Sequence, residues 1–72
     1  MYRVKFVNRQ RYPHIILELQ DTATEETKWW CLASSQYDEL CQQLGVTHLK
    51  GCTLPVLPVH GGWIAKEDIY LL

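Results

Sequence analysis

The chain has 72 residues, of which 47% are hydrophobic and 21% are charged, and its formal net charge is -1. This length allows a single domain, residues 1–72, and excludes an enzyme built from separate substrate and cofactor domains. The apolar fraction excludes a disordered tail, and the near-zero net charge disfavours a strongly basic nucleic-acid coat protein. We therefore expect one small folded domain.

The N-terminal residues and the cysteines indicate the compartment. No apolar segment of the length of a secretory signal or a membrane span follows the first residues. The cysteine count is odd, which favours reduced thiols over a disulfide framework. We therefore expect a cytoplasmic protein with the free thiols Cys31, Cys41 and Cys52.

The N-terminal half predicts an antiparallel meander of about three strands. Apolar side chains alternate with basic ones over residues 2–6, and over residues 15–20 every second side chain is Ile or Leu, with Ile16, Glu18 and Gln20 at the positions between them. This is the period of a half-buried strand. A loop over 8–14 separates these strands, and a polar turn over 21–26 leads to a third strand at 27–33. The inward residues of the first two strands are expected to be Tyr2, Val4, Phe6, Ile15, Leu17 and Leu19.

A single amphipathic helix is expected after the third strand. Ser34 or Ser35 can cap its start, and Gly45 followed by Val46 predicts a Schellman stop. A helix of about ten residues is too short to be stable alone, so it must pack on one face of the sheet. Its apolar stripe has the spacing i, i+3, i+4 and i+7 and consists of Tyr37, Leu40, Cys41 and Leu44.

The C-terminal segment has a less regular pattern. Two prolines within Leu54–Val59 exclude a central strand and favour an edge strand or a polyproline-like segment. Residues 63–65 have the composition of an extended segment, and we expect residues 69–72 to close the sheet. The predicted fold class is α+β, a small antiparallel sheet with one helix on one face and a Pro-containing C-terminal segment that adds edge strand structure.

Sequence motifs for catalysis are missing. The chain has no GxSxG nucleophile elbow and no glycine-rich phosphate loop. Its adjacent acidic residues are typical of solvated turns, and a domain of this size has difficulty building a pocket that excludes water. We therefore expect a protein that is not an enzyme, with no catalytic residues, no resident metal and no cofactor.

The tandem tryptophans indicate a docking surface. On a regular strand Trp29 and Trp30 point to opposite faces, so one of them is expected outside the core. Strand alternation assigns Ile16, Arg3 and Lys5 to the outward side as well. An exposed Trp beside an Ile, with Arg and Lys around it, has the composition of a protein-binding hot spot.

The favoured hypothesis is a small accessory protein that acts as an inhibitor or adaptor by steric docking onto a partner protein. Self-association is its simplest version, because an exposed strand edge or apolar face can pair with a second copy and give a homodimer. The pattern leaves open the identity of the partner and which of the two tryptophans is exposed.

A first alternative is a small nucleic-acid-binding protein that uses the basic N-terminal hairpin. Single-strand binders combine basic side chains for phosphate contact with aromatic rings for base stacking. The residues with this composition are Arg3, Lys5, Arg9, Arg11 and Tyr12.

A second alternative is a regulatory protein that contains zinc or uses a thiol. His48 and Cys52 are spaced as a feasible local ligand pair, and Cys31 or His60 could complete it. Structural zinc sites usually show two tight ligand pairs, which this chain lacks.

Overall fold

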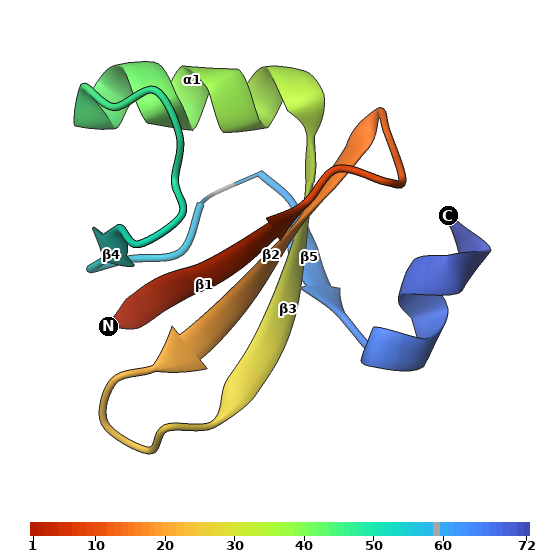
Figure 1. The fold of residues 1–72 in the computed structure, drawn as a ribbon, viewed down its shortest axis with the longest axis horizontal. Coiled ribbons are helices and arrows are strands. Elements are labelled where there is room, and N and C mark those ends of the chain that lie inside the picture. The colour runs from red at the N-terminus through yellow and green to blue at the C-terminus, as the bar shows by residue number, and fades with distance from the viewer. Residues whose placement is uncertain (59) are drawn as a thin grey trace.

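The computed structural model describes residues 1–58 and 60–72, and a curved antiparallel sheet forms its centre (Figure 1). Within these residues the sheet has five strands in the order β4-β1-β2-β3-β5. An α-helix, α1 (Ser34–Leu44), follows β3, and a 3-10 helix, η1 (Lys66–Leu71), follows β5. The strands are β1 (Tyr2–Asn8), β2 (His14–Asp21), β3 (Thr27–Ala33), β4 (Thr53–Leu54) and β5 (Gly62–Ile64).

The α+β class agrees with the prediction, but the sheet is larger than a three-stranded meander. The β1–β2–β3 meander forms its centre. The short strand β4 pairs with β1 at one edge of the sheet, and the short strand β5 pairs with β3 at the other edge. In the Leu54–Val59 segment, Val59 lies outside the described residues.

The prediction of a closing strand over 69–72 is wrong, because the chain forms η1 there. Two acidic residues, Glu67 and Asp68, lie in the first turn of η1, where a helix dipole favours them.

A β-bulge changes which side chains β1 turns inward. Val4 lies opposite Leu19, whereas Phe6 lies opposite Glu18, so two residues of β1 advance against one residue of β2. Phe6 therefore faces away from the core and is 50% exposed, although the alternation predicted that it faces inward. Val7 packs against the core instead.

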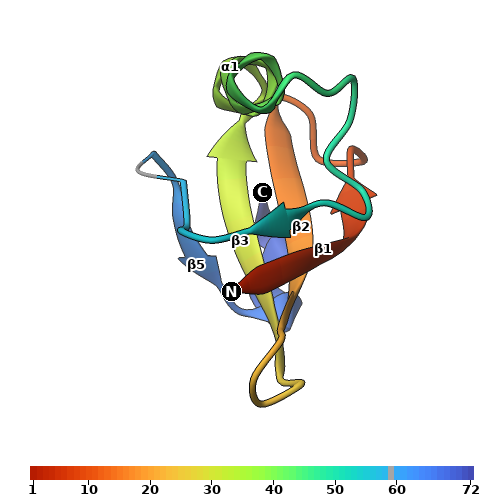
Figure 2. The same ribbon diagram turned by 90° about the vertical axis from the view of Figure 1, so that its left-hand side faces the viewer.

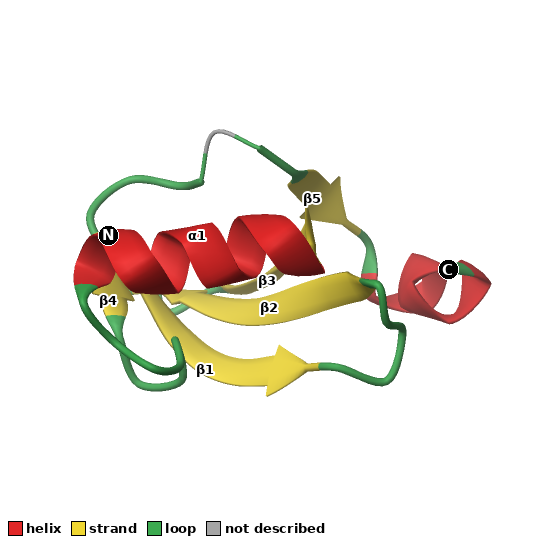
Figure 3. Cartoon of the chain, turned by 90° about the horizontal axis from the view of Figure 1, so that it is seen from above, coloured by secondary structure: helices red, strands yellow, loops and turns green. Residues whose placement is uncertain are grey.

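The core lies between the inner face of the sheet, α1 and the segment that connects α1 to β4 (Figures 1 and 3). The helix contributes Tyr37 and Cys41 to it, while Leu40 is half-buried and Leu44 is exposed. The predicted stripe is therefore buried only in part. The buried core side chains are Val4, Ile15, Leu17, Leu19, Trp30, Leu32, Tyr37, Cys41, Leu49 and Leu54.

The two ends of α1 differ in how they agree with the sequence. The N-cap position is occupied by Ala33, which forms no side-chain cap, so the predicted serine cap is wrong. At the other end Gly45 is left-handed, with φ 68°, and its N–H donates to the Gln42 carbonyl. The next N–H, from Val46, donates to the Cys41 carbonyl. These two bonds form the predicted Schellman stop.

The second helix, η1, lies against the other face of the sheet. Figure 2 shows it behind β2 and β3, on the side opposite to β4. Its Ile69 is 6% exposed, and Ile16, which β2 turns to the same face, is 1% exposed. The expectation that Ile16 is available to a partner is therefore wrong, because a 3-10 helix covers the face that the strand alternation left open.

Candidate functional site

The two tandem tryptophans have different roles. Trp30 faces the core, and its indole N–H donates to the His60 carbonyl over 3.4 Å. Its ring also packs edge-to-face against Trp63, with ring centroids 4.9 Å apart. Trp30 therefore holds β5 to the core and is not a docking residue. Trp29 lies opposite Glu18 on the other face of the sheet and stays partly exposed.

Trp29 lines a groove between η1 and the outward face of the sheet, which we call the outer groove. Its cavity volume is about 170 Å³. Phe6 and Tyr70 contribute exposed rings, and Ile69 contributes a buried apolar side chain. The complete lining consists of Phe6, Asn8, Gln10, Arg11, Glu18, Trp29, Lys66, Ile69 and Tyr70.

Two cations lie over the aromatic rings of the outer groove. The Arg11 guanidinium carbon is 5.4 Å from the Tyr70 ring centroid, and Lys66 Nζ is 5.8 Å from that of Trp29. At these distances the face of a ring attracts a cation. Glu18 supplies the carboxylate in the lining. The outer groove can therefore accept an apolar group while its cations meet an acidic one.

The predicted rim of Trp29 is not the observed one. Arg3 lies opposite Gln20 and Thr53, and Lys5 lies at the bulge of β1. Both are exposed, and neither lines the outer groove. Lys66 was not predicted as a rim residue, because its place beside Trp29 depends on η1, and a strand was expected over residues 69–72.

The residues predicted to bind nucleic acid are divided between two sides of β1. Arg9 lies beside α1, with its guanidinium carbon 4.7 Å from the Tyr37 ring centroid, whereas Arg11 lies at the outer groove. Arg9 contributes to a second cavity of about 290 Å³, which we call the basic hollow. The basic hollow is lined by Phe6, Val7, Arg9, Tyr37, His48 and Lys50. Tyr12 is 73% exposed and lines neither the outer groove nor the basic hollow.

The cysteines of the zinc or thiol alternative pair with different histidines. Cys31 Sγ is 4.0 Å from His14 Nδ1, whereas the Cys52 thiol donates to the His48 carbonyl over 3.7 Å. Among the residues that the structure describes, no three His, Cys, Asp or Glu side chains gather as a metal site requires. Burial raises the pKa of the Cys31 and Cys41 thiols, which favours the protonated, weakly nucleophilic form.

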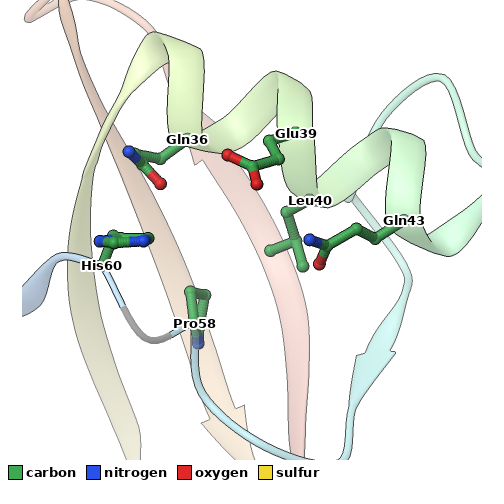
Figure 4. Close-up of a pocket in the computed structure, with 6 residues that line it drawn as sticks. All are labelled: Gln36, Glu39, Leu40, Gln43, Pro58 and His60. Carbon is green, nitrogen blue, oxygen red and sulfur yellow. The ribbon is translucent and has the colours of Figure 1, made fainter.

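A small polar hollow lies between α1 and the segment that precedes β5 (Figure 4). Its volume of about 100 Å³ is well below the roughly 300–1,000 Å³ of ordinary ligand pockets. His60 lies here, whereas His48, another residue of the zinc alternative, lines the basic hollow. The lining consists of Gln36, Glu39, Leu40 and Gln43 from α1, with Pro58 and His60 facing them (Figure 4). We assign no ligand to it.

Comparisons of the chain with protein-family models, with curated proteins and with solved structures found no match. In the part of the chain that the structure describes, no helix has the length and apolar character of a membrane span. The function is therefore inferred from the geometry of the outer groove and the basic hollow.

Proposed function

We propose that the protein is a small interaction module that acts as an inhibitor or adaptor by docking a partner protein against the outer groove. The observation that supports this function is the position of Trp29, a partly exposed tryptophan that lines the outer groove together with the exposed rings of Phe6 and Tyr70. Tryptophan, tyrosine and arginine are the residues on which binding energy most often depends.

The lining of the outer groove defines the chemistry of the partner. The apolar surface of Trp29 and Ile69 suits an aliphatic or aromatic side chain. Arg11 and Lys66 lie over aromatic rings, which places both charges above the apolar surface. A partner segment with an apolar residue next to an acidic one meets both features. A second copy of the chain is one such partner, and steric occupation of the partner's surface requires no catalytic group.

The test compares Trp29→Ala and Tyr70→Ala with the wild-type protein in pull-downs from the host lysate after nuclease treatment. Val56→Ala is the matched control, because Val56 is 75% exposed and lies outside the outer groove. For the recovered partner, Trp29→Ala should weaken the Kd by about tenfold or more, as expected for a hot-spot residue. The Kd is measured by calorimetry, and circular dichroism verifies that each variant is folded.

The oligomeric state tests the self-associating form of this function. A dimer that is seen in sedimentation equilibrium and that dissociates in Trp29→Ala supports docking of a second copy. A partner that binds Trp29→Ala and Tyr70→Ala as tightly as the wild-type protein contradicts the proposed function, whether that partner is another protein or a second copy.

A further inference from the structure

The basic hollow has a charge pattern that the docking function does not use. Arg9 and Lys50 are both exposed at its edge, together with His48, and its lining contains no carboxylate. Asp38, which follows Tyr37 on α1, does not line it. The hollow therefore presents positive charge around an apolar surface, which is the pattern expected for an anionic ligand.

Two further basic side chains, Arg3 and Lys5, continue along β1 from the hollow. The segment around residues 51–54 runs beside this strand, because the Gly51 N–H donates to the Val4 carbonyl and the Val4 N–H donates to the Cys52 carbonyl. Residues 1–17 and 40–66 contain no Asp or Glu, so the two adjacent segments carry basic charge only. From Arg3 to Arg9 an extended strand covers roughly 20 Å.

An aromatic ring and a planar cation lie at the end of this surface. Phe6 is 50% exposed and lines the basic hollow, and Lys50 Nζ lies 5.9 Å from its ring centroid. The Arg9 guanidinium lies over the ring of Tyr37, and both residues also line the basic hollow. Bases stack on exposed aromatic rings and on guanidinium planes, while phosphates follow the neighbouring cations.

We propose that the basic hollow and β1 bind single-stranded nucleic acid. One base enters the hollow against Phe6, and the phosphates of the strand meet four cations. These cations are Arg3, Lys5, Arg9 and Lys50. The hollow, at about 290 Å³, is close to the lower end of the roughly 300–1,000 Å³ of ordinary ligand pockets, so it suits one base and not a duplex. The proposed binding residues differ from those expected from the sequence of the hairpin. They include Lys50 and Phe6 and leave out Arg11 and Tyr12.

The test measures fluorescence anisotropy of a labelled oligothymidine and an oligouridine of about twelve nucleotides, a length within the usual site size. The salt series begins at about 50 mM. Four phosphate contacts predict a slope of about -3 for log K against log salt, and Lys50→Ala should reduce its magnitude by about 0.7.

A pair of charge reversals isolates the site. Lys50→Glu and Lys66→Glu change the net charge equally, and both lysines lie over aromatic rings, but only Lys50 lines the basic hollow. Lys50→Glu should weaken oligonucleotide binding by about tenfold or more, while Lys66→Glu leaves it within about twofold. Partner docking at the outer groove should weaken in Lys66→Glu and stay unchanged in Lys50→Glu, because only Lys66 lines that groove. The experiment therefore tests the two functions separately.

Three results would overturn the proposal. The first is no binding by wild-type protein at about 100 µM in low salt, where even non-specific binders associate. The second is an equal loss in Lys50→Glu and Lys66→Glu, which would mean that only net charge matters. The third is equal binding by uridine monophosphate or by a polyglutamate peptide, which would indicate a small phosphate ligand or an acidic protein instead of a strand.

Discussion

At the scale of single residues, Tyr37 connects the helix to the chain that follows it. Its side chain is 2% exposed, and its hydroxyl oxygen accepts a buried hydrogen bond of 3.0 Å from the Leu49 N–H. Tyr37→Phe removes the acceptor and leaves this N–H buried without a partner. We expect the free energy of unfolding to fall by about 1–3 kcal/mol, measured by urea denaturation.

The control for this prediction is Tyr12→Phe, the same chemical change at a residue that is 73% exposed. Its effect should stay within about 0.5 kcal/mol. Burial raises the pKa of the Tyr37 phenol above its ordinary value of 10.0, so its neutral form stabilises the fold below that pH. This contribution is lost as the pH rises above 10.0, and Tyr37→Phe should remove it from the alkaline unfolding profile. Equal stability of the wild-type protein and Tyr37→Phe would contradict the assigned role.

The alternation of side chains predicted part of the residue-scale arrangement. It correctly placed Trp29 and Trp30 on opposite faces, because strand geometry alone decides this. It failed at Phe6, because one extra residue in β1 turns every later side chain to the other face. A bulge depends on pairing with β2, and the sequence of β1 contains no local signal for it. Phe6 consequently lines both proposed surfaces, although the sequence analysis assigned it to the core.

At the scale of elements, local signals were predictable and long-range pairings were not. Gly45 ends α1 through its own left-handed conformation, so the sequence was sufficient to place that end. The pairing of β4 with β1 and of β5 with β3 depends on contacts between distant segments. Residues 69–72 are all apolar and resemble a buried strand, yet only Ile69 is buried. The outer groove depends on η1, so the sequence could supply Trp29 but not the surface around it.

Gly61 controls how closely β5 approaches β3. Its φ is +109°, and a Cβ there would run into the Cys31 carbonyl oxygen and lie 2.8 Å from Trp30 Nε1. Gly51 also has a positive φ, +85°, but a Cβ on it would meet nothing within 4 Å. Both Ala variants are strained by about 1–2 kcal/mol, and Gly61→Ala adds roughly 1–3 kcal/mol from overlap. Thermal and urea unfolding should therefore show Gly61→Ala as the less stable of the two.

The fluorescence of Trp30 gives a second measurement on the same pair of variants. Displacement of β5 removes Trp63 and the His60 carbonyl from the indole of Trp30, so emission should shift to longer wavelength in Gly61→Ala only. If Gly51→Ala is equally destabilised and shows the same shift, then the close contact of Gly61 with Cys31 and Trp30 does not determine the position of β5 beside β3.

At the scale of the whole molecule, the net charge is small, but basic and acidic residues are concentrated in different parts of the fold. The two acid-free segments are paired along β1, whereas Glu25 and Glu26 lie in the β2–β3 turn at another part of the fold. In the described chain, five of the seven Lys and Arg side chains also lie over aromatic rings. Four of these five cations line the two surfaces, with Arg9 and Lys50 at the basic hollow and Arg11 and Lys66 at the outer groove. The fifth, Lys28, lies over Trp63 and lines neither surface. Composition gives the number of these charges, and only the fold shows where they lie.

The sheet of this small domain is covered on both faces, and the cover on the outward face depends on Ile69. This residue is 6% exposed and lines the outer groove together with Trp29. Ile69→Ala should lower the free energy of unfolding by about 2–5 kcal/mol, a large share of the roughly 5–15 kcal/mol that stabilises a typical domain. Leu71→Ala is the matched control in η1, because Leu71 is 81% exposed and its loss should change stability by less than about 0.5 kcal/mol.

Packing of η1 also determines whether the outer groove exists. If Ile69→Ala loosens η1, then Trp29 becomes more exposed, and quenching of tryptophan fluorescence by acrylamide should increase relative to Leu71→Ala. Binding of a partner at the outer groove should weaken in Ile69→Ala, while oligonucleotide binding at the basic hollow should not, because Ile69 lines only the former. Stability of Ile69→Ala equal to that of Leu71→Ala would mean that η1 does not pack on the sheet in solution. The outer groove, and the docking function that depends on it, would then have no structural basis.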